Sequence, residues 1–293
     1  MKCGKRSILI LLTISLAMLL LSGCQFNLSF GIGNFITGES YLNAEAYQTG
    51  AFSYEADEVQ SIEIYWRCGK VNIVETDSSE LRVSESGGEL PEKTAMHYLL
   101  ADGSLKIRFC ESDAKINVSS QDKHLTIEVP KGIDLSVHTT SAPVQADTLE
   151  QNSVLISVHS GEIRLGIVEA GDVNLSSSSG TIRADSIITQ ALECSASSGA
   201  VRIGEAEADT MDVDTSSGSV ELGILSAPDV DIHTSSGKTK LRLLEGGGAV
   251  SYTSNSGKLH TDVAFERNGD LYVFGNGESR ITVDSSSGNL EIQ

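Results

Sequence analysis

Residues 173–218 read VNLSSSSGTIRADSIITQALECSASSGAVRIGEAEADTMDVDTSSG, and the fold can be predicted from this segment. It contains a Ser-Gly pair three times, and the glycines of successive pairs are 19 residues apart. The pair recurs on both sides of the stretch, and its glycines are Gly161, Gly180, Gly199, Gly218, Gly237, Gly257 and Gly288. Ala142 stands 19 residues before the first of them and adds one more repeat. Self-similarity at a fixed short period is typical of repeat architectures.

Apolar residues occupy the same positions in every repeat, counted from this glycine. The positions seven and five residues before it are apolar throughout, and Cys194 and Val213 belong to the second of these columns. The positions two and four residues after it are apolar except at Thr239 and Thr261. The position seven residues after it is held by Leu149, Val168, Ile187, Ala206, Leu225, Leu244 and Ala264. Alternation with a period of two indicates β-strands with one buried face.

A repeat of 19 residues is too short to bury such a face alone. Stacked repeats bury it together, and each pairs with the next at a spacing of about 4.8 Å. We therefore predict an all-β protein, a single-stranded parallel β-solenoid (β-helix) with rungs of about 19 residues. At the corners the glycines are expected to adopt positive φ angles, and the serines to form local hydrogen bonds.

The pattern weakens toward the N-terminus. Gly69, Gly103 and Lys123 are each followed by two alternating apolar residues, which suggests three degenerate rungs with an insertion near residues 84–101. Terminal repeats of solenoids are usually atypical because they cap the core. Residues 55–130 are assigned to these rungs, with a small β-sandwich-like cap as the alternative.

The rest of the mature chain, residues 131–293, is assigned to the regular solenoid. Its last step spans 31 residues instead of 19. We predict that the extra residues form a hairpin insertion near residues 265–277.

The N-terminus is typical of an exported lipoprotein. Three basic residues precede an apolar segment of 15 residues, and Leu-Ser-Gly-Cys follows at residues 21–24. A membrane span would need about 20 apolar residues, so a cleaved secretory signal fits better. We predict a signal peptide at residues 1–23, a lipid on Cys24 and a flexible tether over residues 24–54. The lipid would hold the protein at the outer face of the cell membrane, although the sequence does not decide which membrane.

The mature chain is strongly acidic. Removing residues 1–23 leaves 18 basic against 40 acidic residues, a net charge of −22. Such a chain repels phosphate backbones, which argues against nucleic acid as a partner. Basic polymers, cations and neutral glycans remain as partners, and the acidic surface also keeps a regular sheet soluble.

Catalytic and metal-binding patterns are weak in this sequence. His138 and His233 share one outward column but lie five rungs apart, roughly 24 Å, so one metal cannot join them. A column of serines is flanked by a single histidine, His159, and lacks the acid that a nucleophilic site requires. It comprises Ser178, Ser197, Ser216, Ser235 and Ser286. We predict no catalytic residue, no cofactor and no metal site, and we interpret the serines as a ladder of turns.

The cysteines allow more than one interpretation. Cys194 falls in an inward apolar column and is interpreted as a small core residue. Cys68 and Cys110 remain, and an exported protein permits a disulfide between them. The spacing does not decide whether they pair.

Three motifs resemble a known bacterial family. Residues 125–132, LTIEVPKG, resemble its opening motif, the Ser-Ser-Gly rungs resemble its body, and residues 275–292, GNGESRITVDSSSGNLEI, resemble its closing motif. This is the β-strand-repeat family known as "putative adhesin", a domain of unknown function. The resemblance covers residues 55–293 and implies the fold, without supplying catalytic residues.

The expected function is therefore non-enzymatic. A lipid-anchored surface solenoid would bind cell-wall polymer, a glycan or another envelope protein. One alternative is an envelope-stress sensor or scaffold, and another is a polysaccharide-active β-helix enzyme. The enzyme is disfavoured because its site would need clustered charged residues on long loops, whereas these rungs are evenly spaced.

Overall fold

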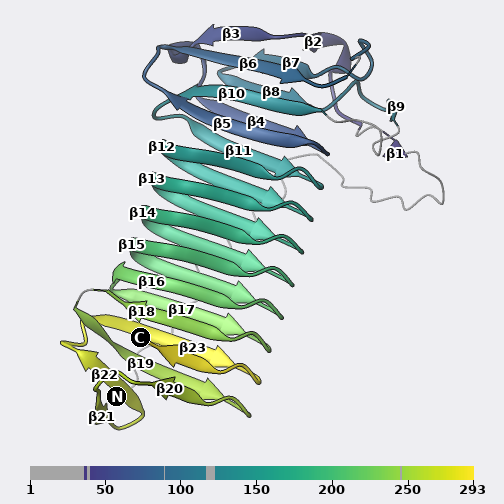
Figure 1. Ribbon diagram of the computed structural model, residues 1–293. Coiled ribbons are helices and arrows are strands. Elements are labelled where there is room, and N and C mark those ends of the chain that lie inside the picture. The colour runs from purple at the N-terminus through teal and green to yellow at the C-terminus, as the bar shows by residue number, and fades with distance from the viewer. Residues whose placement is uncertain (1–35, 38–39, 89, 117–122, 245) are drawn as a thin grey trace, which may run out of the picture.

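Parallel strands stacked along one axis make up most of the chain (Figure 1). This computed structural model describes residues 36–37, 40–88, 90–116, 123–244 and 246–293. The body of the stack consists of β11 (Asp134–Thr139), β12 (Val144–Val158), β13 (Ile163–Ser177), β14 (Ile182–Ala196), β15 (Val201–Thr215), β16 (Val220–Ser226), β17 (Asp229–Thr234) and β18 (Thr239–Leu243). None of the described segments forms a helix with the length and apolar composition of a membrane span.

The two ends of the stack are built from shorter elements. The N-terminal end comprises β1 (Ile36–Thr37), η1 (Ala44–Ala46), β2 (Gln48–Thr49), β3 (Phe52–Glu55), η2 (Ala56–Glu58), β4 (Ser61–Trp66), β5 (Lys70–Thr76), β6 (Glu80–Ser86), β7 (His97–Ala101), β8 (Ser104–Arg108), β9 (Lys115–Ile116) and β10 (His124–Pro130). The C-terminal end comprises β19 (Gly247–Ser254), β20 (Leu259–Thr261), β21 (Glu266–Asn268), β22 (Leu271–Gly275), β23 (Ser279–Ser285) and β24 (Leu290–Ile292).

Neighbouring rungs of the body pair in parallel with an offset of 19 residues. Val154 pairs with Val173, Val173 pairs with Leu192, and Leu192 pairs with Met211. Each long strand continues from one sheet into the opposite one, since the first residues of β12 pair with β5 and its last residues pair with β11. The Ser-Ser-Gly turn then returns the chain to the first sheet. The resulting shape is a flattened, parallel, solenoid-like stack (Figure 1).

The apolar columns lie inside the stack. Val213 is fully buried, and even Thr239 is only 1% exposed. The column seven residues after the glycine ends earlier than predicted, because Leu225 is half-buried while Leu244 and Ala264 are exposed. A register shift opposite Ala206 turns Ile224 into the core instead. A β-bulge of this kind moves the buried position by one residue.

The turn glycines are needed for a reason other than the predicted one. None of the seven has a positive φ angle. A Cβ atom on Gly199 would instead lie 1.8 Å from the carbonyl oxygen of Gly180, and one on Gly218 would lie 1.8 Å from that of Gly199. The same close approach recurs at the other turn glycines, at 1.7–2.3 Å. The glycines therefore form a ladder in which each turn lies directly against the carbonyl of the next rung.

The N-terminal end contains two degenerate rungs, so the prediction of three is wrong. Gly103 lies just before β8, and β8 pairs with β4, the strand that precedes the turn at Gly69. Gly103 therefore does not occupy a turn position of the glycine ladder. Strands β8 and β10 thus belong to one rung, and β4 and β5 form the other. The β4–β5 rung lies between the β8–β10 rung and the body, so the first rung in the sequence is the second in the stack. Antiparallel strands β7 and β6 then cover β8 and β10.

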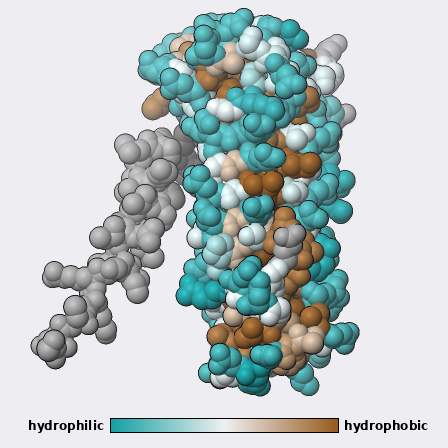
Figure 2. Space-filling view, turned by 90° about the vertical axis from the view of Figure 1, so that its left-hand side faces the viewer, coloured by the Kyte–Doolittle hydropathy of each residue, from teal (hydrophilic) through white to brown (hydrophobic). Residues whose placement is uncertain are grey.

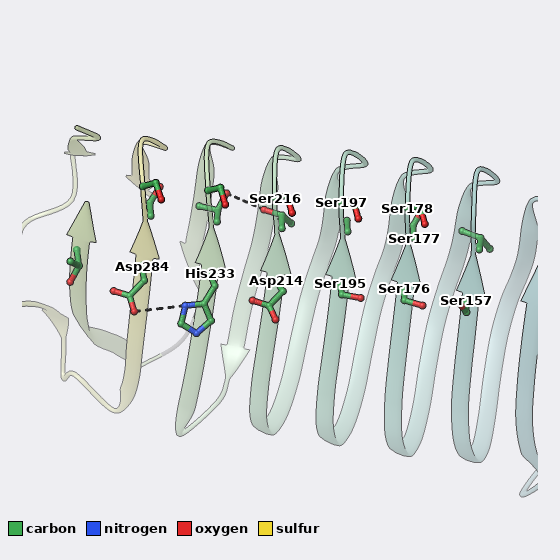
Figure 3. A pocket seen from close by; sticks show the side chains of 18 residues that line it. Ser157, Ser176, Ser177, Ser178, Ser195, Ser197, Asp214, Ser216, His233 and Asp284 are labelled. Carbon is green, nitrogen blue, oxygen red and sulfur yellow. Dashed lines mark hydrogen bonds and ion pairs between the residues drawn. The ribbon is translucent and has the colours of Figure 1, made fainter. Parts of the chain in front are cut away.

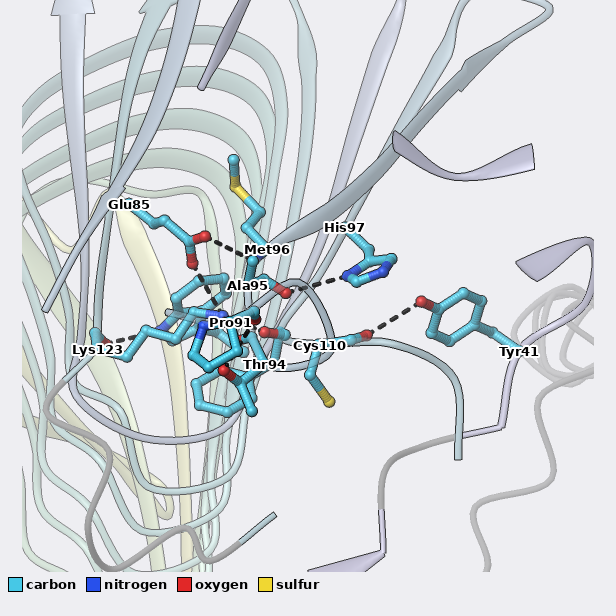
Figure 4. Close-up of polar contacts among 11 residues, drawn as sticks. Tyr41, Glu85, Pro91, Thr94, Ala95, Met96, His97, Cys110 and Lys123 are labelled. Carbon is cyan, nitrogen blue, oxygen red and sulfur yellow. Dashed lines mark hydrogen bonds and ion pairs between the residues drawn. The ribbon is translucent and has the colours of Figure 1, made fainter. Parts of the chain in front are cut away.

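Lys123 closes the glycine ladder at this end. A Cβ on Gly69 would lie 1.8 Å from the Lys123 carbonyl, and the Lys123 side chain is fully buried (Figure 4). Its Nζ donates to the carbonyl oxygens of Thr94, at 2.6 Å, and Phe109, and it pairs with the Glu85 carboxylate at 2.9 Å. Burial lowers the pKa of Lys123, and the ion pair with Glu85 opposes that shift. Two hydrogen bonds and one ion pair compensate the ammonium charge, which makes a buried cation tolerable here.

The C-terminal end also departs from sequence order. Strand β17 pairs with β23, and β23 pairs in turn with β19, so the last rung in the sequence is the second from the end of the stack. Strand β24 likewise lies between β18 and β20. Strands β21 and β22 form an antiparallel hairpin inside the segment predicted as an insertion, and β22 pairs with the outer edge of β19. Because the hairpin covers that edge, β23 pairs with the inner one.

Candidate functional site

A shallow polar groove runs along the stack beside the turns and encloses about 700 Å³ (Figure 3). One column of its lining lies four residues before the turn glycines and comprises Ser157, Ser176, Ser195, Asp214, His233, Asp284 and Thr253. A second column lies two residues before the glycines and comprises Ser178, Ser197, Ser216, Ser235 and Ser286. Members of the first column are paired rung to rung, so they are spaced by about 4.8 Å.

The strand pattern explains why these side chains face solvent. Val213 and Thr215 point inward, so Asp214 between them points outward. The same alternation applies to every rung of the groove. The side chains between the two columns are mostly buried and form the bottom of the groove, including Ser177, Ala196 and Thr234.

Hydroxyl groups at the bottom of the groove brace the turns. Thr215 Oγ1 donates to the Gly218 carbonyl at 3.1 Å, and Thr234 Oγ1 accepts from the Gly237 N–H at 3.1 Å. The turns also pair with one another, since the Ser198 N–H donates to the Ser178 carbonyl at 3.0 Å. A groove with both walls held by backbone hydrogen bonds presents its serines in a preorganised array.

One end of the groove is acidic. Asp214, His233 and Asp284 lie on three successive rungs, and His233 Nδ1 is 3.7 Å from Asp284 Oδ2 (Figure 3). Asp212 lies on the same outer face, where burial and the Asp214 carboxylate raise its pKa. This end therefore favours hydroxyl donors or a cationic group over an anion.

Planar side chains continue the same column beyond the other end. His138 pairs with Ser157, and its ring stacks on Tyr65 with centroids 4.9 Å apart and an interplanar angle of 23°. The Arg108 guanidinium lies 3.8 Å from the Tyr65 ring centroid. Burial lowers the pKa of His138, and the Arg108 charge adds to that shift. The column thus passes from a stacked aromatic end through hydroxyls to an acidic end.

This arrangement suits binding better than catalysis. Serine hydroxyls both donate and accept hydrogen bonds, so a row of them matches a ligand rich in hydroxyl groups. Ser136 Oγ lies 3.0 Å from His138 Nε2 but outside the groove, and no groove serine of the described chain has a hydrogen bond to a histidine base. Within the same described ranges, no group of three acidic, histidine or cysteine side chains is arranged to hold a metal ion.

The residues singled out in the sequence are distributed as follows. The serine column lines one side of the groove, and His233 lies opposite it in the other column. Cys194 is buried in the core, where burial raises the pKa of its thiol to about 12. Cys68 and Cys110 are thiols and no disulfide joins them. Cys24 lies outside the described residues.

Sequence reasoning missed the groove itself. Its signal was present, because the position four residues before the glycine is serine on three successive rungs, Ser157, Ser176 and Ser195. Polar residues on an outward column are common on solvated sheets, so the column alone did not indicate a site. The bend of each rung toward its turn creates the hollow, and that bend is a tertiary feature.

Comparisons with known proteins agree with this fold. A solved structure from Parabacteroides distasonis, described as a putative lipid binding protein, is 16% identical, with a TM-score of 0.53, over 83% of this chain and 97% of that chain. A second, from Parabacteroides merdae and described as a putative adhesin, is 14% identical, with a TM-score of 0.51, over 84% of this chain and 96% of that chain. No curated protein matched the chain. The sequence model of the Toastrack DUF4097 family matches residues 59–293, and the chain belongs to this family.

Proposed function

We propose that this protein is a non-enzymatic surface protein that binds a linear glycan along its hydroxyl-lined groove. The single observation that supports this proposal is the in-register column of polar side chains over seven rungs, from Ser157 to Thr253. At about 4.8 Å per step the column is roughly 29 Å long, enough for several sugar residues of an extended chain. The acidic end selects neutral or amino sugars over acidic ones.

Comparison with similar structures supports a binding role in general terms. Those neighbours are described as putative adhesins or as a putative lipid binding protein, at identities of 11–16%. A groove that is open and polar fits a polymer ligand better than a lipid tail, because an acyl chain would gain nothing from the exposed hydroxyls. The glycan is therefore the ligand class that we favour.

Replacing Ser195 with tyrosine should weaken glycan binding. The larger side chain would stand in the middle of the groove and block the continuous row of hydroxyls. We expect at least a tenfold loss of affinity for neutral or amino oligosaccharides, measured by calorimetry against cello-oligosaccharides, chitosan oligosaccharides and polygalacturonate. Ser84→Tyr is the matched control, because Ser84 is also exposed on a strand but lies in the N-terminal cap. Equal affinity of Ser195→Tyr and the unmodified protein, or binding of polygalacturonate alone, would refute the proposal.

The anchor is the second part of the proposed function. A diacylated Cys24 would hold the stack at the outer face of the cell membrane, with the residues before η1 as the connection. The predicted tether over residues 24–54 is too long, because β2 and β3 at its C-terminal end pair with β7 and β6 and belong to the folded cap. Cys24→Ala should shift the protein from the membrane fraction to the soluble fraction of the exporting cell. Cys3→Ala is the control, since Cys3 lies in the segment predicted to be removed. Retention of Cys24→Ala in the membrane fraction would contradict lipid anchoring.

A further inference from the structure

The two ends of the stack are closed to different extents. At the N-terminal end, β7 covers β8 and β6 covers β10, so both sheets have an antiparallel strand beyond their last parallel one. At the C-terminal end, β22 covers only β19. Strand β20 pairs with β24 on its inner side and with no other strand of the described chain. An exposed strand edge is a template for adding another strand.

The backbone of β20 is oriented for such an addition. The Lys258 carbonyl accepts from the Leu290 N–H at 3.0 Å, so the polar backbone groups at this position face β24. Backbone groups alternate in direction along a strand, which turns those of Leu259 and Thr261 toward the open edge. Two residues with outward N–H and C=O groups can exchange hydrogen bonds with a second strand.

Apolar side chains surround this edge. Leu259 is half-buried, while Val263 and Phe265 are 41% and 44% exposed. Figure 2 shows hydrophobic surface at this C-terminal end of the molecule and also along the body of the stack. Terminal repeats of solenoids usually carry a polar outer face. The partly apolar C-terminal end of this stack therefore suits a surface that another molecule covers.

The charges beside β20 are self-complementary. Lys258, Leu259, His260, Thr261 and Asp262 follow one another in the sequence. If two copies pair in antiparallel fashion about His260, Lys258 of each copy lies opposite Asp262 of the other. Leu259 then lies opposite Thr261, so the outward backbone groups meet. Lys258 and Asp262 are both exposed, and within the described residues neither belongs to an ion pair.

We propose that two copies of this chain associate tail to tail through antiparallel β20 strands centred on His260. The contact is isologous, with the same residues contributed by each copy. Two cross-strand pairs of opposite charge and the apolar side chains at the edge favour this register over others. The described chain begins at the opposite, N-terminal end of the stack (Figure 1). If the anchoring proposed above holds, the contact would join molecules that stand on two facing surfaces.

A charge-swap series tests the contact. Sedimentation equilibrium is measured on the chain from Gln25 onward, which keeps every described residue. The unmodified protein should show a concentration-dependent monomer–dimer equilibrium. Asp262→Lys and Lys258→Asp should each weaken the dimer at least tenfold, because like charges then face each other across the strands. The double variant with both changes should restore the dimer, which loss of folding could not do.

Asp185→Lys is the matched control, since Asp185 is an exposed strand residue in the body of the stack. It should leave the dimer unchanged. A protein that stays monomeric at all concentrations, or a double variant that is no better than the single ones, would overturn the proposal. Ser195→Tyr separates the two ideas, because it should weaken glycan binding at least tenfold and leave the dimer intact.

Discussion

Replacing Val213 with aspartate should destabilise the whole stack. Val213 is fully buried, and it pairs rung to rung with Cys194 on one side and Ile232 on the other. A carboxylate at this position would have no partner and no water, and an uncompensated buried charge costs several kcal/mol. For a domain of this size about 2–4 °C of Tm is lost per kcal/mol, so the Tm should fall by roughly 10 °C or more.

Leu155→Asp is the matched control for Val213→Asp. Leu155 is exposed on the outer face of β12 and pairs with the uncharged Ser136 and Asn174, so the new carboxylate stays in water with no acid directly opposite. Surface substitutions of this kind usually change stability by no more than about 0.5 kcal/mol. Thermal unfolding followed by circular dichroism should therefore separate the two variants clearly. An unchanged Tm for Val213→Asp would show that this column does not point into the core.

Replacing Gly199 with alanine should also be strongly destabilising, although the change adds only one methyl group. The new Cβ would lie 1.8 Å from the Gly180 carbonyl oxygen, a backbone atom that cannot move without shifting a neighbouring rung. Overpacking of interiors costs about 1–3 kcal/mol, and a clash between two backbones should fall at the upper end of that range or beyond it. Urea unfolding gives the change in free energy directly.

Gly88→Ala distinguishes this clash from a general effect of losing a glycine. A Cβ at Gly88 meets nothing within 4 Å, and its φ angle is not in the left-handed region. Alanine at such a site restricts the unfolded chain and should be neutral or stabilising by about 0.4–1 kcal/mol. If Gly199→Ala and Gly88→Ala were equally stable, the close approach between rungs would not be the reason for the glycine ladder.

The order of the rungs has a consequence for stability as well. The first rung in the sequence, β4–β5, and the last, β23–β24, each have a parallel neighbour on both sides. The β8–β10 rung lies beyond the first of them, and the β19–β20 rung lies beyond the last. The outermost parallel rungs of the stack, β8–β10 and β19–β20, are therefore internal segments of the sequence, and folded chain precedes and follows each of them. An open repeat array frays from its termini, and this arrangement removes the terminal segments from the fraying positions.

Periodicity in the sequence was enough to predict the parallel stack, most of the inward columns and the positions of the turns. Val213, Ile232 and the other apolar residues recur at fixed distances from a glycine, and burial of apolar side chains depends mainly on that local pattern. The same pattern predicted the core position of Cys194, which is buried. The turn glycines were predicted to adopt positive φ angles, and this prediction was wrong. A glycine that is needed for close approach between rungs and one that is needed for a positive φ angle look the same in a sequence.

The order of the rungs at the two ends of the stack could not be predicted from the sequence and follows from tertiary packing. Strands β19 and β23 carry the same alternating pattern, and backbone hydrogen bonds do not discriminate between them. Their order follows from the β21–β22 hairpin, which covers one edge of β19 and leaves the other to β23. The groove and the burial of Lys123 arise in the same way, from contacts between segments far apart in the chain. A repeated pattern makes every rung an acceptable neighbour for every other, so the choice among them depends on long-range packing that the period does not encode.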